Sequence, residues 1–203
     1  MKQVQKPREF THDWFTGHAK PMFEALTQHV PQKGPINVLE IGAFEGRATC
    51  WMLDNWISDR KESHISVVEP FTGAADHEGM EIDWKAVKSR FMKNTDAEDN
   101  ALIVQLMEMT SDKALPLLRS WGETYDFVYI DGSHRARDVM HDAVLAWGMM
   151  DKGAILLFDD YLWGDRSQPL ETPKPAIDAF CLLYGDELEI VATGYQLAVR
   201  KIK

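Results

Sequence analysis

The sequence predicts an α/β protein built on a doubly wound, mostly parallel sheet of seven strands that ends in an antiparallel hairpin. Short apolar runs alternate with helical segments five times along the chain. Such alternation is typical of parallel strands joined by right-handed crossovers, with helices on both faces. Near the end, Thr193-Gly194-Tyr195 separates two further strand-like runs. This is a hairpin signal, so one of these two strands should run against the others.

The strands of the parallel part are predicted from short apolar runs that stop at turn residues. The leading segment from Phe10 to Val30 has the pattern of a helix that is broken or started at Pro21. The first apolar run then ends at Gly42, as expected of a strand buried on both faces. The second ends at Pro70, which cannot continue a strand ladder. The predicted parallel strands cover residues 36–41, 65–69, 101–107, 125–130 and 154–158.

Helical periodicity is clearest between His134 and Met150. Apolar residues recur there at the spacing of one helical face, and Lys152-Gly153 then closes the helix before the fifth strand. The predicted helices cover residues 47–56, 111–121, 134–150 and 175–184, and the hairpin strands cover 188–192 and 196–200.

Length and charge limit the classes of protein to consider. With 203 residues, we expect a single domain over 1–203, in which residues 1–33 form an N-terminal helical segment, a lid or a dimer contact. The formal charge of −10 would repel nucleic acid. No apolar run approaches the roughly 18 residues of a membrane helix, and Met1 to Phe10 lacks the apolar core of a secretory signal. We expect a cytoplasmic protein without nucleic-acid or membrane partners, and a homo-oligomer is compatible with the sequence.

The turn after the first strand, Glu40 to Gly46, resembles a dinucleotide-binding fingerprint but fails it. A GxGxxG motif counted from Gly42 requires glycine at the positions of Phe44 and Arg47. The carboxylate of Glu40 would also oppose a pyrophosphate at the following helix N-terminus. A ligand with a positive centre and no phosphate suits this turn better, and S-adenosylmethionine, with its sulfonium and ammonium groups, meets that description.

A second acid, Glu69, ends the second predicted strand. A carboxylate in this place can accept both ribose hydroxyls of a nucleoside. Alternatively, Glu40 and Glu69 are solvated acids at strand ends. Their occurrence at successive strand ends around a glycine turn favours the ligand hypothesis.

Two motifs are similar to those of the class I S-adenosylmethionine-dependent methyltransferases, which have a Rossmann-like fold. Val38 to Gly46 resembles their first motif, and Val67-Val68-Glu69-Pro70 resembles their second. The usual middle glycine of the first motif is Phe44 here, a departure shared by the catechol-type and macrocin-type O-methyltransferases. The resemblance extends from about Ile36 to Phe180.

This resemblance implies roles for individual residues. Glu40 and the turn would line the methionine portion of the donor, and Glu69 would hold the ribose. Met109-Thr110-Ser111-Asp112 matches the segment that contacts adenine. The implied cofactor-binding residues are Glu40, Gly42, Ala43, Phe44, Gly46, Glu69, Ser111 and Asp131.

Three aspartates follow the fourth and fifth strands, whose ends should be neighbours in the sheet. Asp131, Asp159 and Asp160 would repel one another unless a cation neutralised them. Mg²⁺ or a similar divalent cation takes carboxylate oxygens and keeps positions open for substrate. The alternative is that the aspartates cap the following turns. The DGSH and DDY segments resemble those of the macrocin-type O-methyltransferases, whose matching acids bind a divalent cation.

The expected reaction is methyl transfer to a deprotonated hydroxyl. Coordination to a divalent cation lowers the pKa of a hydroxyl, and a nearby base then accepts the proton. His134, three residues after Asp131, is the candidate base, and Asp131 could share the role. Otherwise His134 begins the next helix or hydrogen-bonds a loop.

We therefore expect metal-assisted O-methylation of a small hydroxylated molecule. The alternatives are a metal-independent N- or C-methyltransferase with the same donor, and a non-catalytic nucleotide-binding protein. Acceptor specificity should reside in loops. The candidates are Tyr161 to Arg166, Phe71 to Ile82, and the segment that contains Phe10, Trp14 and Phe15.

Overall fold

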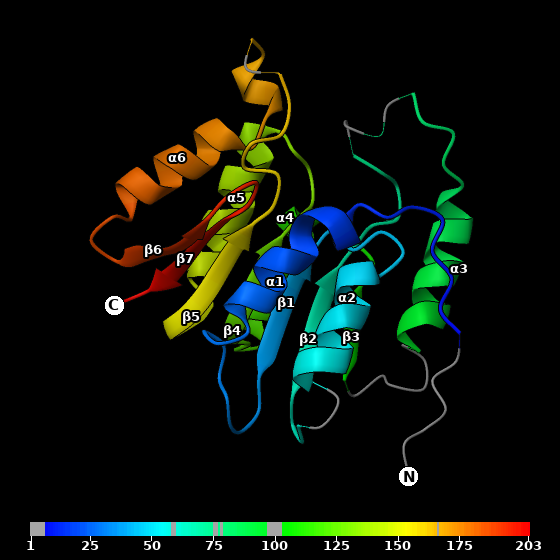
Figure 1. The fold of residues 1–203 in the computed structure, drawn as a ribbon, viewed down its shortest axis with the longest axis horizontal. Coiled ribbons are helices and arrows are strands. Elements are labelled where there is room, and N and C mark those ends of the chain that lie inside the picture. Colours follow the sequence, from blue (N-terminus) through cyan, green and yellow to red (C-terminus); the bar gives the residue numbers. More distant parts are fainter. Residues whose placement is uncertain (1–6, 58–59, 75–76, 78, 97–102, 166) are drawn as a thin grey trace.

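Seven strands form one sheet in the computed structural model, which describes residues 7–57, 60–74, 77, 79–96, 103–165 and 167–203 (Figure 1). The strand order is β3-β2-β1-β4-β5-β7-β6, and β7 is antiparallel to both β5 and β6. The predicted doubly wound sheet with one reversed strand near the carboxyl end is therefore confirmed. The strands are β1 (Asn37–Ile41), β2 (His64–Val68), β3 (Val104–Met107), β4 (Tyr125–Ile130), β5 (Met150–Phe158), β6 (Leu188–Thr193) and β7 (Leu197–Lys201).

Helices cover both faces of this sheet, and each face has its own core. In Figure 1, α1 and α2 lie in front of the strands, while α4, α5 and α6 lie behind them. Successive residues of β1 alternate between the two cores. Val38 belongs to the core that includes residues of α1 and α2, and Leu39 belongs to the core that includes residues of α4, α5 and α6. The helices are α1 (Lys20–Leu26), α2 (Arg47–Met52), α3 (Trp84–Thr95), α4 (Ser111–Ser120), α5 (Ala136–Trp147) and α6 (Lys174–Leu183).

The strand order reverses between β1 and β4, which lie side by side in the middle of the sheet. At their carboxyl ends the two backbones touch, because Asp131 N donates to Ile41 O at 2.8 Å. Gly42 has φ +84°, and a Cβ there would stand 2.0 Å from Asp131 O. Only glycine fits this contact, which brings the glycine turn and the first aspartate to one place. Ligands of open α/β sheets bind in the crevice at such a reversal.

The observed elements differ from the predicted ones in three places. The helix α3 was not predicted, because Val87 and Phe91 are its only buried large apolar residues in a charged segment. Its start is nevertheless signalled by Asp83, whose side chain accepts from Lys85 N and Ala86 N. The predicted 134–150 helix ends at Trp147, and Met150 already begins β5 by pairing with Tyr125. The leading segment becomes helical at Phe15, with a π-helical turn before α1.

Several predictions fall partly on residues outside the described ranges, which exclude residues 1–6 of the N-terminal segment and residues 75, 76 and 78 of the predicted loop from Phe71 to Ile82. The third strand was predicted from Ala101, and the described part of β3 starts at Val104. Arg166, the cation of the predicted acceptor loop, also lies outside the described residues. Among the described residues, none of the helices is both long and apolar enough to cross a membrane.

Candidate active site

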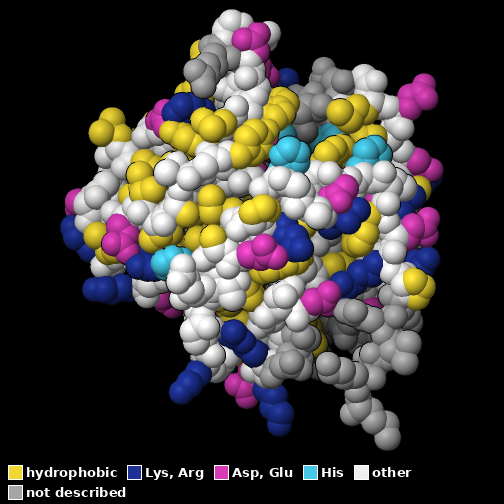
Figure 2. Space-filling view, in the orientation of Figure 1, with side chains coloured by type: hydrophobic (Ala, Val, Ile, Leu, Met, Phe, Trp, Pro, Cys, Tyr) yellow, Lys and Arg dark blue, Asp and Glu magenta, His cyan; other side chains and the backbone are white. Residues whose placement is uncertain are grey.

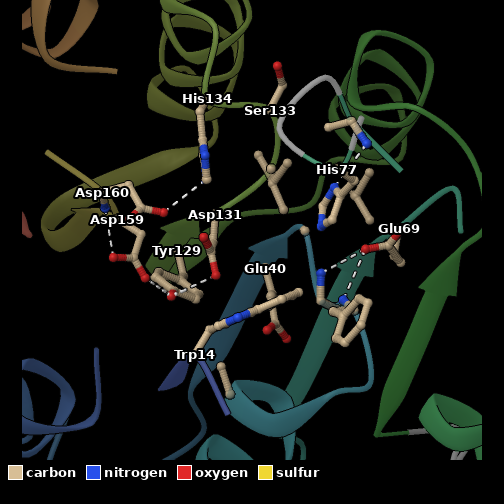
Figure 3. A pocket seen from close by; sticks show the side chains of 18 of the residues that line it. Trp14, Glu40, Glu69, His77, Tyr129, Asp131, Ser133, His134, Asp159 and Asp160 are labelled. Atoms are coloured by element: carbon tan, nitrogen blue, oxygen red, sulfur yellow. Dashed lines mark hydrogen bonds and ion pairs between the residues drawn. The ribbon is translucent and has the colours of Figure 1, made fainter. Parts of the chain in front are cut away.

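A cavity of about 620 Å³ lies at the carboxyl ends of the central strands (Figure 3). Its walls come from the glycine turn, the ends of β2, β4 and β5, the starts of α4 and α5, and the segment before α1. The structure therefore brings almost all predicted site residues together. Those that line the cavity are Glu40, Gly42, Ala43, Phe44, Glu69, Ser111, Asp131, His134, Asp159 and Asp160.

Gly46, predicted to contact the cofactor, is not among the residues that line the cavity. It precedes α2 with φ +78°, and a Cβ there would stand 2.9 Å from the Phe91 ring. The glycine is therefore explained by the close packing of α2 against α3, and its cofactor contact stays a prediction.

Glu40 is fully buried at the end of β1. Thr49 Oγ1 donates to its Oε2 at 2.5 Å, while Oε1 has no hydrogen-bond partner among the described residues. Burial raises the pKa of this carboxyl to about 8, and the neighbouring charge of Glu69 adds to the increase. The cavity thus presents an unsatisfied carboxyl oxygen, which a cationic or hydrogen-bond-donating ligand group would satisfy.

Glu69 braces the glycine turn from the end of β2. Its Oε2 accepts from Ala43 N and Phe44 N at 3.0 and 3.1 Å, and its Oε1 accepts from Phe71 N at 2.7 Å. Figure 3 shows the two bonds to the turn as dashed lines. A carboxylate has about four acceptor positions, two on each oxygen, so Oε1 keeps one for a ligand hydroxyl. The predicted ribose role is compatible with this geometry, and the acid also fixes the turn.

A tyrosine hydroxyl joins two acids on the other side of the cavity. Tyr129 Oη lies 2.9 Å from Asp131 Oδ2 and also contacts Asp159 Oδ2. A hydroxyl carries one hydrogen, so both contacts are satisfied only if one of the two carboxyls is protonated. Burial, followed by the charges of Asp159 and Asp160, raises the pKa of Asp131 well above its usual range. A proton or a cation bound between these acids would relieve their mutual repulsion.

His134 points toward this cluster from the loop before α5 (Figure 3). Its Nε2 lies 2.9 Å from Asp160 Oδ2, and its ring lies against Trp163 with 4.5 Å between ring centroids. Asp131, His134 and Asp160 each offer one ligand atom, and these atoms all lie within 4.8 Å of one another. The group of potential metal ligands therefore includes the histidine.

Asp159, a predicted metal ligand, is held differently from the other two aspartates. Besides the contact with Tyr129, its Oδ1 accepts from Gln196 Nε2 at 2.8 Å and from Asp160 N at 2.7 Å. Asp159 is also outside the group of three potential ligands. Its direct role at a metal stays a prediction, and the observed contacts position Tyr129 and the turn into Asp160.

The chain before α1 crosses the cavity and is anchored by a buried acid. Glu45 accepts from Thr11 N and Thr11 Oγ1, both at 2.6 Å, and from Arg90 Nε at 2.5 Å. Just beyond this anchor, Trp14 lies 4.8 Å from the Phe44 ring, measured between centroids. Both aromatic side chains line the cavity, so this segment forms a wall of the site.

The comparisons with known proteins agree with this geometry. Residues 39–161 match the family model described as a methyltransferase domain. The chain belongs to this methyltransferase family. Together with the strand order and the two acids around the glycine turn, the match makes it a class I S-adenosylmethionine-dependent methyltransferase.

Solved methyltransferase structures share the fold at low sequence identity. The O-methyltransferase NovP is 16% identical, with a TM-score of 0.62 over 91% of this chain and 77% of that chain. TomG from Streptomyces achromogenes is 14% identical, with a TM-score of 0.65 over 91% and 79%. An O-methyltransferase from Bacillus cereus is 17% identical, with a TM-score of 0.61 over 95% and 84%. These likenesses establish the fold.

A curated relative, the uncharacterised protein R132 of Acanthamoeba polyphaga mimivirus, is 25% identical over 142 residues. The aligned part is 68% of this chain and 58% of that protein, so the methyltransferase chain spans less than two thirds of this relative.

Several residues of the methyltransferase site were missed by the sequence analysis. Tyr129 and Gln196 hold the acid cluster, and Asp142 lines the cavity from α5. Tyr129 was hidden within an apolar strand, because a buried tyrosine is ordinary in such a run. Asp142 did carry a signal, since an acid there interrupts the apolar face that Val139 and Ala146 define.

Proposed function

We propose that the chain transfers a methyl group from S-adenosylmethionine to an oxygen of a small hydroxylated molecule, with the help of a divalent cation. The observation that carries the proposal is one continuous cavity. It is lined at one end by Glu40 and Glu69 and at the other by Asp131, His134 and Asp160. NovP, TomG and the Bacillus cereus protein, which share the fold, are O-methyltransferases, and this supports oxygen as the acceptor.

The donor end of the cavity suits a cationic ligand. The unsatisfied Oε1 of Glu40 would accept a hydrogen bond from the ammonium of the methionine portion, and Oε1 of Glu69 would accept one from a ribose hydroxyl. Methyl transfer needs mainly a nucleophile placed about 3 Å from the reacting carbon, in line with the bond that breaks. The close contact between Gly42 and the backbone of Asp131 brings the two ends of the cavity together at the centre of the sheet.

The acceptor end has a donor set that fits a divalent cation. The carboxylates of Asp131 and Asp160 lie within reach of one ion, with the imidazole of His134 beside them, and oxygen donors suit Mg²⁺ or Mn²⁺. The raised pKa of Asp131 reflects charge repulsion as well as burial, and a cation would relieve that repulsion. When bound there, such an ion lowers the pKa of a coordinated hydroxyl.

His134 would accept the proton from the acceptor hydroxyl. Asp160, 2.9 Å from its Nε2, orients the imidazole and stabilises its protonated form. The nearby rings of Trp163 and Tyr195 offer flat walls for the acceptor.

The proposal is tested by measuring S-adenosylhomocysteine formation with a panel of small hydroxylated acceptors, before and after chelation by EDTA. We expect turnover that chelation abolishes and added Mg²⁺ or Mn²⁺ restores. His134→Ala should reduce turnover by about 10²- to 10⁴-fold while Mn²⁺ affinity, followed by calorimetry, stays within a few fold.

The control is His64→Ala, which alters a histidine at the start of β2, outside the cavity and the acid cluster. It should leave both quantities unchanged. Undiminished turnover in EDTA would remove the cation from the mechanism. Loss of Mn²⁺ affinity in His134→Ala would make the histidine a ligand instead of a base.

A further inference from the structure

Asp142 is a buried acid in the cavity that has no role in the proposed mechanism. It lies on the apolar face of α5, where Val139, Ala143 and Ala146 are also buried, and it is 3% exposed. It lines the cavity beside Ser111, the first residue of α4. A charged group on the packed face of a helix is costly unless something in the structure or a ligand compensates it.

The protein itself satisfies only part of this carboxyl. The Ser111 hydroxyl hydrogen-bonds to it, but Oδ1 is buried without a hydrogen-bond partner among the described residues. The nearest cationic candidate, His141 Nδ1, stands 4.0 Å from Oδ1, beyond hydrogen-bond length. An unmet buried acceptor costs about 1–3 kcal/mol, so the site lacks a donor that a ligand could bring.

The position of Asp142 indicates which group of the ligand would bind to it. Its Oδ2 lies 3.9 Å from where a Cβ of Gly132 would stand, so the acid borders the turn that follows β4. The ammonium of the donor already has Glu40 at the end of β1, and the ribose has Glu69 at the end of β2. The remaining hydrogen-bond donor of S-adenosylmethionine is the exocyclic amino group of adenine, and Ser111 lies at the end of the site where adenine is expected.

A metal ion does not explain this acid. Asp112, Asp138 and His141 are its charged neighbours. Among the described residues, however, the group with metal-ligand spacing is Asp131, His134 and Asp160. A neutral hydrogen-bond donor is the partner that remains, because the ammonium and the ribose hydroxyls of the donor already have Glu40 and Glu69.

We propose that Asp142, held by Ser111, accepts a hydrogen bond from the adenine amino group and selects the base of the methyl donor. This inference rests on the proposed donor. It adds a specificity-determining residue on α5, outside the two motifs that follow β1 and β2. Replacing the amino group by a carbonyl oxygen would set two acceptors against each other, which a buried site rejects strongly.

The test compares two ligands by calorimetry: S-adenosylhomocysteine, and S-inosylhomocysteine, in which a carbonyl replaces the amino group. The wild-type chain should bind the adenine compound at least tenfold more tightly. In Asp142→Asn the ratio should fall to within about threefold, because the amide can turn its NH₂ toward the carbonyl. Asp138→Asn, on the same helix and cavity but bonded to Ser133, should keep the wild-type ratio.

A folded Asp142→Asn variant that keeps the wild-type ratio would overturn the inference, because Asp142 would then only anchor Ser111. Should this variant fail to fold, the wild-type pair of affinities still decides, since equal binding excludes selection of the amino group. If neither compound binds, the proposed donor is overturned, and the inference with it.

Discussion

Glu40 is an acid whose ionisation depends on what the cavity holds. With a pKa of about 8, against an ordinary value of 4.5, its folded form keeps a proton that the unfolded form loses. The folded state therefore loses stability as the pH rises between these two values, by up to about 1.4 kcal/mol per pH unit. A cationic ligand would reverse this cost by favouring the ionised form.

Glu40→Gln should flatten this pH dependence in the ligand-free protein. Relative to the wild type, the variant is expected to become progressively more stable from pH 5.5 to 8, as measured by urea unfolding at several pH values. Glu45→Gln is the control. Burial alone would raise the pKa of Glu45, but the hydrogen bonds from Thr11 and Arg90 outweigh this effect and lower the pKa below its ordinary value. Glu45 therefore titrates below the pH range of this experiment. Parallel pH profiles for the wild type and Glu40→Gln would refute the raised pKa.

The sequence predicts single residues well where they follow strands and poorly where they interrupt apolar patterns. Glu40, Glu69 and Asp131 were found because parallel strands deliver their next residues to one edge of the sheet. The division of roles among the three aspartates depends on Tyr129 and Gln196, which reach them from β4 and from the turn before β7. Such contacts depend on side-chain directions that no local pattern encodes.

At the scale of elements, the segment before α1 belongs to the site. It is anchored through Thr11 on Glu45, and Trp14 packs on Phe44 of the glycine turn. The sequence analysis predicted that this segment forms a lid or a dimer contact. In the structure, its aromatic side chains line the wall of the cavity. The helix α3, which supplies Arg90 to the same anchor, was missed because its apolar face is short.

Trp14→Ala should weaken the binding of S-adenosylhomocysteine by about three- to tenfold, the worth of an aromatic contact. Calorimetry measures the affinity, and urea unfolding checks that global stability is kept, since Trp14 is 46% exposed. Trp121→Ala is the control, because this tryptophan is comparably exposed, at 55%, but outside the cavity. Equal affinities for the wild type and Trp14→Ala would mean that the segment covers the site without touching the donor.

At the scale of the whole molecule, charge is spread while acids concentrate in the cavity. On the face in Figure 2, Lys and Arg side chains are interspersed with Asp and Glu. The carboxyl groups of Glu40, Glu69, Asp131, Asp159 and Asp160 all border one space. Such a space repels phosphates and attracts cations, which separates this sheet from dinucleotide-binding sheets of similar topology.

The topology itself was predictable because strand and helix alternation, crossover handedness and the final hairpin signal all agree. The boundaries of the helices and strands were harder to predict than the topology. The start of β5 at Met150 depends on pairing with Tyr125 and on a register shift between Tyr125 and Phe127. These interactions lie between distant parts of the chain, so helical periodicity alone carried the predicted helix too far.

The central claim is that this crevice binds a cationic nucleoside cofactor. It is tested most directly by the melting temperature of the chain with S-adenosylhomocysteine or NAD at matched concentrations. At about one hundred times its dissociation constant, the first should stabilise the folded state by about 2.7 kcal/mol. This corresponds to an increase of about 5–10 °C for a chain of this size, with no shift from NAD. An increase with NAD and none with S-adenosylhomocysteine would contradict the account.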